Sequence, residues 1–201
     1  MSLTESIKNF WVFLKKDTWQ SWLVSLLLIV ILIKFIFFPI VSFITGTSLP
    51  LVVVESCSMY HESNFDNWWS QNAQWYESRN ITKSEFSNFK MMNGLNKGDI
   101  ILVIKETIPK IGDIIIFQPN TDSTTQHPII HRIVGLNPVQ TKGDHNTQQI
   151  TQNNNQQHLD ETNIPKDRII GKSVLKIPIL GWIKLIFFEP FKDPSQRGFC
   201  N

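Results

Sequence analysis

The residues best suited to chemistry in this sequence are a serine, a histidine and an aspartate in three separate segments. Ser58 follows a short apolar run, His131 lies in an apolar segment, and Asp144 ends the sequence Thr-Lys-Gly-Asp. A serine hydroxyl attacks a carbonyl carbon when an imidazole takes its proton, and a carboxylate can orient that imidazole. These residue types therefore fit nucleophilic hydrolysis, which also requires hydrogen-bond donors for the developing oxyanion.

Each of these residues also has a purely structural interpretation. An isolated serine is usually a turn residue, a histidine in an apolar strand is more often a hydrogen-bonded core residue, and Asp144 fits an ordinary turn. The sequence contains neither a Gly-x-Ser-x-Gly nucleophile turn nor a His-Glu-x-x-His zinc motif. Only the combination of the segments favours an enzyme.

An apolar segment near the N-terminus predicts a transmembrane anchor over residues 19–45. Its core, Trp19–Phe38, has one charged residue, Lys34, and as a helix of about 20 residues it spans roughly 30 Å, the thickness of the bilayer hydrocarbon. Lys34 can extend its ammonium to the far surface, and Pro39 is expected to end or kink the helix. A buried core helix and a cleaved signal peptide are less favoured, because the run is long and no small-x-small site follows closely.

The basic residues around this segment predict its direction in the membrane. Three lysines lie within residues 1–18, whereas none of residues 35–78 is Lys or Arg. Positive charge is enriched on the cytoplasmic side of membrane anchors. We therefore expect residues 1–18 to form a cytoplasmic tail and residues 46–201 to form an extracytoplasmic domain.

The residues after the anchor predict a mainly β domain. Short β-branched runs separated by Gly and Pro favour an antiparallel arrangement over a parallel α/β sheet. The predicted strands are Leu51–Val54, Asp99–Lys105, Asp113–Phe117, Pro128–Val134 and Arg168–Ile177.

Three other segments differ from this pattern. Residues 62–97 are polar and rich in aromatics, and we expect a partly helical insertion packed on the body. Residues 145–163 contain a tract rich in Asn and Gln that cannot bury a core, so a surface loop is expected. The apolar segment Ile179–Phe188 is too short to cross a bilayer; it fits either a core strand or helix, or a surface that dips into the membrane interface.

Composition limits the classes of partner. The net charge of +2 is small and the basic residues are scattered, which argues against a nucleic-acid partner. The two cysteines, Cys57 and Cys200, make neither a disulfide framework nor a metal-site spacing. We expect both to be free, although one bridge is possible in an oxidising compartment.

Taken in order, these segments resemble the sequence boxes of signal peptidase I. The matching segments are Ser56-Cys57-Ser58-Met59, Gly98-Asp99, Gly112-Asp113, Pro128-Ile129-Ile130-His131-Arg132, Thr141-Lys142-Gly143-Asp144, Ile170-Gly171-Lys172 and Ile177-Pro178-Ile179-Leu180-Gly181-Trp182. No single box is specific, but the ordered set is. Bacterial-type members carry a lysine base before the arginine, so His131 places the resemblance with the archaeal and endoplasmic-reticulum type.

The resemblance implies a role for each candidate residue. Ser58 would be the nucleophile, and His131 the general base and then the acid for the leaving amine. Asp144 would orient the imidazole, with Asp160 as the alternative acid. The backbone N–H of Ser58 and the Ser56 hydroxyl would form the oxyanion hole.

Two departures from the family pattern affect these roles. Cys57 stands where the family usually has Gly; it is disfavoured as the nucleophile because neighbouring side chains on an extended segment point in opposite directions. Relatives often carry a second Asp five or six residues after the first, but here those positions are Gln149 and Ile150. Asp160 is the candidate that an insertion would have displaced.

The resemblance also implies a signal-peptidase-like coiled β-sheet or barrel body and an activity. The protein would remove signal peptides from secretory preproteins at the outer membrane surface, without a metal or organic cofactor. Its partners would be preproteins, membrane lipids and the secretion translocon. The alternatives are a non-catalytic, membrane-tethered β-domain that binds partner proteins, and a protease with a narrow set of substrates.

Overall fold

The computed structural model describes residues 2–106, 108–125, 127–153 and 158–200 of the chain. The chain divides into two compact units, one up to Ile44 and one from Thr45 onward. Residues 154–157 of the predicted Asn/Gln-rich loop lie outside the described residues.

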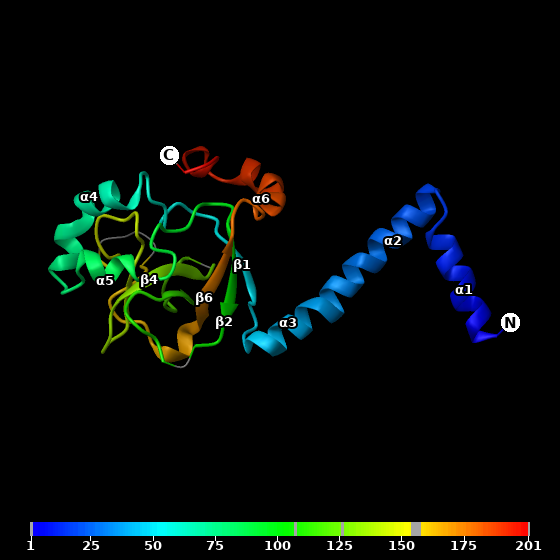
Figure 1. Ribbon diagram of the computed structural model, residues 1–201, viewed down its shortest axis with the longest axis horizontal. Coiled ribbons are helices and arrows are strands. Elements are labelled where there is room, and N and C mark those ends of the chain that lie inside the picture. The colour runs from blue at the N-terminus through cyan, green and yellow to red at the C-terminus, as the bar shows by residue number, and fades with distance from the viewer. Residues whose placement is uncertain (1, 107, 126, 154–157, 201) are drawn as a thin grey trace. The chain divides into compact units, whose positions relative to one another are not determined.

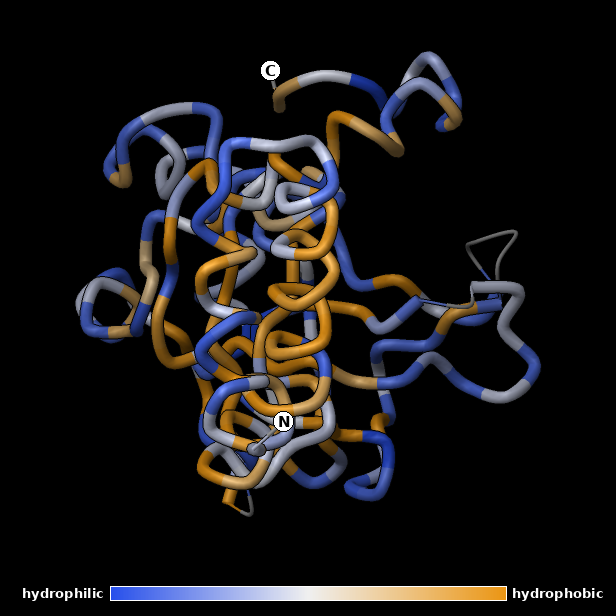
Figure 2. Tube along the Cα trace, turned by 90° about the vertical axis from the view of Figure 1, so that its right-hand side faces the viewer, coloured by the Kyte–Doolittle hydropathy of each residue, from blue (hydrophilic) through white to orange (hydrophobic). Residues whose placement is uncertain are grey.

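The N-terminal unit is helical. It contains α1 (Leu3–Leu14), α2 (Trp19–Leu32), a π-helical turn η1 (Ile33–Phe37) and the start of α3 (Phe38–Thr45). From Trp19 to Thr45 the helix is continuous over 27 residues and apolar, with a mean hydropathy of 2.9 over its most apolar window. The turns of this helix carry the hydrophobic colour almost throughout in Figure 2. It is long and apolar enough to be a single membrane span or signal anchor.

Pro39 does not end the helix, contrary to the first of the two outcomes expected of it. Proline lacks an N–H and its ring crowds the carbonyl one turn earlier, which breaks the normal ladder of hydrogen bonds. Here the wider π-helical turn η1 directly precedes α3, in which Pro39 is the second residue. A π-helical turn absorbs such a defect within a continuous helix.

The second unit is built on one curled antiparallel sheet of six strands, which runs from cyan (β1) to orange (β6) in Figure 1. The strands are β1 (Leu51–Val53), β2 (Ile100–Ile104), β3 (Ile114–Phe117), β4 (Ile129–Gly135), β5 (Gln140–Lys142) and β6 (Ile169–Ile177), in the order β1-β2-β6-β3-β4-β5. All five predicted strands are confirmed. β5 was not predicted, because three polar residues carry no apolar alternation.

The predicted insertion contains two helices, α4 (Phe65–Glu77) and α5 (Lys83–Ser87). Asn64 and Thr82 cap them, because the side-chain oxygen of each accepts a hydrogen bond from a first-turn backbone N–H. An aromatic cluster packs the helices against β4; its buried members are Trp68, Trp69, Tyr76, Ile81, Phe86 and Val134. The insertion is therefore fastened to the strand that carries His131.

The C-terminal part contains η2 (Lys166–Arg168), the helix α6 (Trp182–Phe188), η3 (Glu189–Phe191) and η4 (Pro194–Gln196). The apolar segment Ile179–Phe188 is thus helical over most of its length. Leu185 is buried, whereas Ile183, Ile186 and Phe187 are exposed.

The prediction of two free cysteines is wrong. Cys57 and Cys200 form a disulfide, with their Cα atoms 5.6 Å apart, a separation within the normal range for such bridges. A sequence separation of 143 residues gives no sign of this proximity. The bridge fastens the C-terminal segment to the residue that precedes Ser58.

Candidate active site

Ser58 lies in a tight turn that follows β1. Two backbone hydrogen bonds hold this turn from outside: His145 N–H donates to the Ser58 carbonyl over 2.9 Å, and Leu95 N–H donates to the Met59 carbonyl over 2.8 Å. The Met59 side chain is buried in the core. The position of Ser58 is therefore fixed by the buried side chain of Met59 and by hydrogen bonds from the two segments that contain Leu95 and His145.

His131 projects from the middle of β4, where it pairs with Ile115 of β3. Its side chain is buried, and its Nε2 lies 2.9 Å from Ser58 Oγ. The two residues are 73 positions apart in the sequence. The sheet therefore brings the predicted nucleophile and the predicted base into hydrogen-bond contact.

Glu161 occupies the other side of the imidazole. Its carboxylate is fully buried and contacts His131 Nδ1 through Oε1. The same carboxylate accepts hydrogen bonds from Thr141 Oγ1 over 3.1 Å and from the backbone N–H of Ile150 over 2.8 Å. Three donors thus fix the carboxylate in place and compensate its removal from water.

This arrangement decides the direction of both hydrogen bonds at His131. An ionised carboxylate only accepts, so the Nδ1 proton must point at Glu161 in the neutral imidazole. Nε2 is then the accepting nitrogen and faces the hydroxyl of Ser58. The geometry is that of a nucleophile, a base and an orienting acid.

Asp144 does not contact His131, and this corrects the expectation that it orients the imidazole. Its buried carboxylate pairs with Arg132, whose Nη2 lies 2.6 Å from Oδ2. It also accepts hydrogen bonds from His61 Nε2 at 3.2 Å and from the Tyr76 hydroxyl at 3.4 Å. The reason is strand alternation, because Arg132 points to the opposite face of β4 from His131.

The charge of Asp144 is strongly stabilised. Burial alone raises the pKa of its carboxyl, but the positive charge of Arg132 and the hydrogen bonds from His61 and Arg132 hold the pKa below its usual range. Burial, followed by the negative charge of Asp144, raises the pKa of the Tyr76 hydroxyl. This side of β4 therefore holds a buried ion pair that ties the insertion to the body.

Asp160 does not contact His131 either. Its carboxylate accepts hydrogen bonds from the backbone N–H of Thr162 over 2.9 Å and from the Thr162 hydroxyl over 2.7 Å, and so closes a local turn. Glu161, the next residue, is the one that sequence reasoning missed. The signal was present, since an acid was expected just beyond the Asn/Gln tract, but only aspartates were considered.

Gly143 accounts for the Lys-Gly-Asp turn next to the site. A Cβ atom at this position would lie 2.6 Å from the Ser58 carbonyl oxygen and 2.9 Å from His131 Nε2. Real Cβ atoms do not approach so closely, so only glycine lets the turn pack against both residues. The motif therefore serves the site through its backbone.

The remaining predicted residues surround Ser58. The Ser56 hydroxyl lies 3.2 Å from Ser58 Oγ. Cys57 is in the disulfide, which leaves it no thiolate to act as a nucleophile.

Lys142, the residue before Gly143, is fully buried. Its burial lowers the pKa of its ammonium to about 8.

Nothing in the described part of the chain resembles a metal centre. Across those residues, no three His, Cys, Asp or Glu side chains lie close enough together to hold a metal ion. No protein-family model matches the sequence, and no curated protein matches it either.

Proposed function

We propose that this protein is a membrane-bound serine endopeptidase that removes signal peptides from secretory preproteins. One observation carries the proposal: Ser58 Oγ lies 2.9 Å from His131 Nε2, while Nδ1 of the same ring contacts the buried carboxylate of Glu161. A core histidine needs a hydrogen-bond partner, but it has no need of a partly exposed serine on one nitrogen and a fixed acid on the other.

The proposed reaction follows from these contacts. His131 Nε2 takes the hydroxyl proton as Ser58 Oγ attacks the scissile carbonyl carbon, and Glu161 stabilises the imidazolium that forms. The imidazolium then gives its proton to the leaving amine, which departs and leaves an ester on Ser58. A water molecule, deprotonated by His131, hydrolyses that ester and restores the serine.

The oxyanion of the intermediate needs donors that are already in place. The backbone N–H of Ser58 is one candidate, and the hydroxyl of Ser56 is the other. The Ser56 hydroxyl lies 3.2 Å from Ser58 Oγ, close to the position of the attacked carbonyl. The Cys57–Cys200 bridge restrains the residue between the two serines.

The choice of substrate rests on two further supports. One is the resemblance of the ordered segments to signal peptidase I of the archaeal and endoplasmic-reticulum type, whose body is a coiled β-sheet or barrel. The other is the 27-residue apolar helix from Trp19 to Thr45. We propose that it is a single-pass anchor with its N-terminus in the cytoplasm and the catalytic domain outside, where preproteins emerge from the translocon.

A non-catalytic β-domain that binds partner proteins is the competing function. It would need neither the serine hydroxyl nor the acid behind the imidazole. Burial of Glu161 alone does not separate the two functions, because three donors compensate its carboxylate. The partly exposed Ser58 hydroxyl on the accepting nitrogen of the same imidazole is the feature that a binding domain does not need. The three residues together therefore favour the enzyme.

Cleavage of a preprotein tests the proposal. Detergent-solubilised full-length protein is incubated with a secretory preprotein, and the new N-terminus of the product is determined. We expect one cut, after small residues that follow the apolar part of the signal peptide, and none with Ser58→Ala. Cleavage by Ser58→Ala at the same bond, or no cleavage by the unaltered protein, would overturn the proposal; Ser63→Ala, in an exposed position of the same loop, is the matched control.

A further inference from the structure

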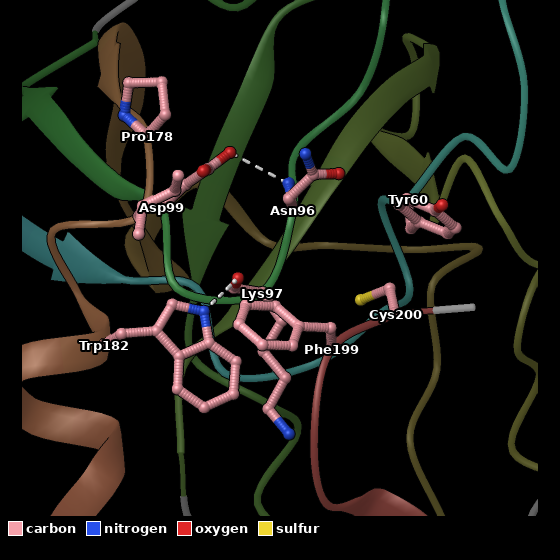
Figure 3. Close-up of a pocket in the computed structure, with 9 residues that line it drawn as sticks. Tyr60, Asn96, Lys97, Asp99, Pro178, Trp182, Phe199 and Cys200 are labelled. Carbon is pink, nitrogen blue, oxygen red and sulfur yellow. Dashed lines mark hydrogen bonds between the residues drawn. The ribbon is translucent and has the colours of Figure 1, made fainter.

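A cavity of about 320 Å³ lies beside the turn that carries Ser58, and nothing in the proposed reaction uses it (Figure 3). Tyr60, two residues after Ser58, lines it together with Cys200. Trp182, at the start of α6, and Phe199, near the C-terminus, also line it. Figure 3 shows the Trp182 and Phe199 rings next to each other, with Tyr60 and Cys200 on the other side.

The walls of this cavity favour an apolar occupant. The rings of Trp182 and Phe199 are 4.4 Å apart between centroids, and they form a continuous aromatic surface. The Lys97 ammonium is already paired with Glu189 at 2.7 Å, and the Asp99 carboxylate already accepts a hydrogen bond from the Asn96 backbone at 2.8 Å.

Because both charged groups have partners within the protein, a polar ligand would have to displace existing contacts to bind them. An apolar side chain would leave those contacts intact and bury its surface against the rings. A volume of this size is at the lower end of the range for ligand pockets, enough for one large side chain.

The cavity is close enough to the nucleophile to receive part of a bound peptide. The Cα atoms of Cys57 and Cys200 are 5.6 Å apart, and Cys57 is the neighbour of Ser58. With consecutive Cα atoms about 3.8 Å apart, Cys200 lies within about 10 Å of Ser58. An extended peptide rises by about 3.3 Å per residue, so it covers this distance in roughly three residues.

One wall of the cavity belongs to the C-terminal strap, which we define as residues 189–200. The disulfide fastens its end, and the Lys97 ammonium fastens its middle by donating to the Gln196 carbonyl over 2.6 Å. The Lys192 ammonium donates to the Glu55 carbonyl over 3.2 Å. The strap therefore holds Phe199 at a defined distance from the nucleophile turn.

We propose that this cavity is a substrate subsite that binds an apolar side chain two to four residues from the scissile bond. The strap sets the size of the cavity, and the disulfide holds the Phe199 and Cys200 side of it at a fixed distance from Ser58. This inference rests on the proposed peptidase function and names a feature of its substrates.

Peptide binding to the inactive Ser58→Ala protein tests the proposal without requiring turnover. Fluorescent peptides that span a cleavage site carry either Leu or Ser at each position within four residues of the cut, and their affinities are measured by polarisation in detergent. At one position we expect Leu to bind about tenfold more tightly than Ser, a typical discrimination for an apolar pocket.

Adding Phe199→Ala should abolish this preference. Adding Cys200→Ser removes the disulfide that fastens the strap but retains the Phe199 ring, and it should weaken the preference. Phe191→Ala is the matched control, since Phe191 lies on the strap, is 87% exposed and does not line the cavity. It should leave the preference unchanged.

The outcomes separate this inference from the proposed function. Equal binding of the Leu and Ser peptides at every position would overturn the subsite, and so would a preference that survives Phe199→Ala. If the unaltered protein cleaves preproteins in either of those cases, the peptidase function stands alone. A preference that depends on Phe199 in a protein with no cleavage activity would support the site and overturn the peptidase.

Discussion

Glu161 contacts Nδ1 of His131 although the two residues are 30 positions apart and lie on either side of an Asn/Gln-rich tract. The contact is buried on both sides. It replaces the two aspartates that the sequence favoured as the acid of the site.

Glu161→Gln should lower kcat by orders of magnitude with little change in KM. A neutral amide can donate to Nδ1, which moves the imidazole proton to Nε2 and leaves no acceptor for the Ser58 hydroxyl. Steady-state kinetics on one preprotein measures both constants. Asp160→Asn is the matched control and should leave kcat and KM nearly unchanged. A large loss of kcat in Asp160→Asn with normal kcat in Glu161→Gln would assign the orienting role to Asp160 instead.

Asp144→Asn should act mainly on stability. It leaves the Arg132 guanidinium buried with a neutral partner, and loss of one member of a buried ion pair typically costs about 3–5 kcal/mol. Thermal unfolding should therefore begin at a clearly lower temperature than for Glu161→Gln. Normal stability with lost turnover in Asp144→Asn would indicate a direct catalytic role instead.

The same ion pair predicts how the stability of the folded domain changes at low pH. Because the folded pKa of Asp144 lies below its ordinary value of 3.8, its contribution is fully present above that pH and is lost gradually as the pH falls from 3.8 toward the lower folded pKa. The difference in melting temperature between the unaltered protein and Asp144→Asn should therefore shrink below about pH 4. A constant difference down to pH 2 would contradict this assignment.

The strands follow from the sequence because their signals are local. The pairing of Ser58 with His131, 73 positions apart, follows only from the order of the segments that resemble signal peptidase I. β-branched runs between glycines predict five strands of the sheet, and the alternation within β4 puts His131 and Arg132 on opposite faces. The acid and the disulfide depend on how loops and the C-terminal segment pack, and no matched segment or local pattern encodes that packing. Asp160 and Glu161 are neighbours that point in different directions, so only the register of the loop decides which of them reaches the imidazole.

Lys142 gives a prediction at alkaline pH. Its pKa of about 8 in the folded protein lies below the ordinary 10.5, so the unfolded chain holds the proton between these values and the folded domain does not. Lys142 therefore destabilises the fold most below pH 8, and stability rises as the pH increases from about 8 to 10.5.

Melting temperatures of the Lys142→Met variant test this sign. The variant should melt several degrees higher than the unaltered protein at pH 7, and the gap should narrow toward pH 10.5. A gap that widens with pH would show that the ammonium is stabilised in the folded domain.

The proposed topology is tested by labelling with a membrane-impermeant maleimide. Asn9→Cys and Thr124→Cys each place one thiol at an exposed position, and the native cysteines are blocked by their disulfide. In intact cells we expect label at position 124 only, with position 9 labelled after permeabilisation. Labelling of position 9 in intact cells would reverse the proposed orientation.

The most direct test of the central claim is the rate of preprotein cleavage by Ser58→Ala, His131→Ala and the double variant. Residues that act as one nucleophile–base unit lose activity together, so each single variant should fall to background and the double variant should fall no further. Substantial turnover in either single variant, or losses that multiply in the double variant, would contradict the account.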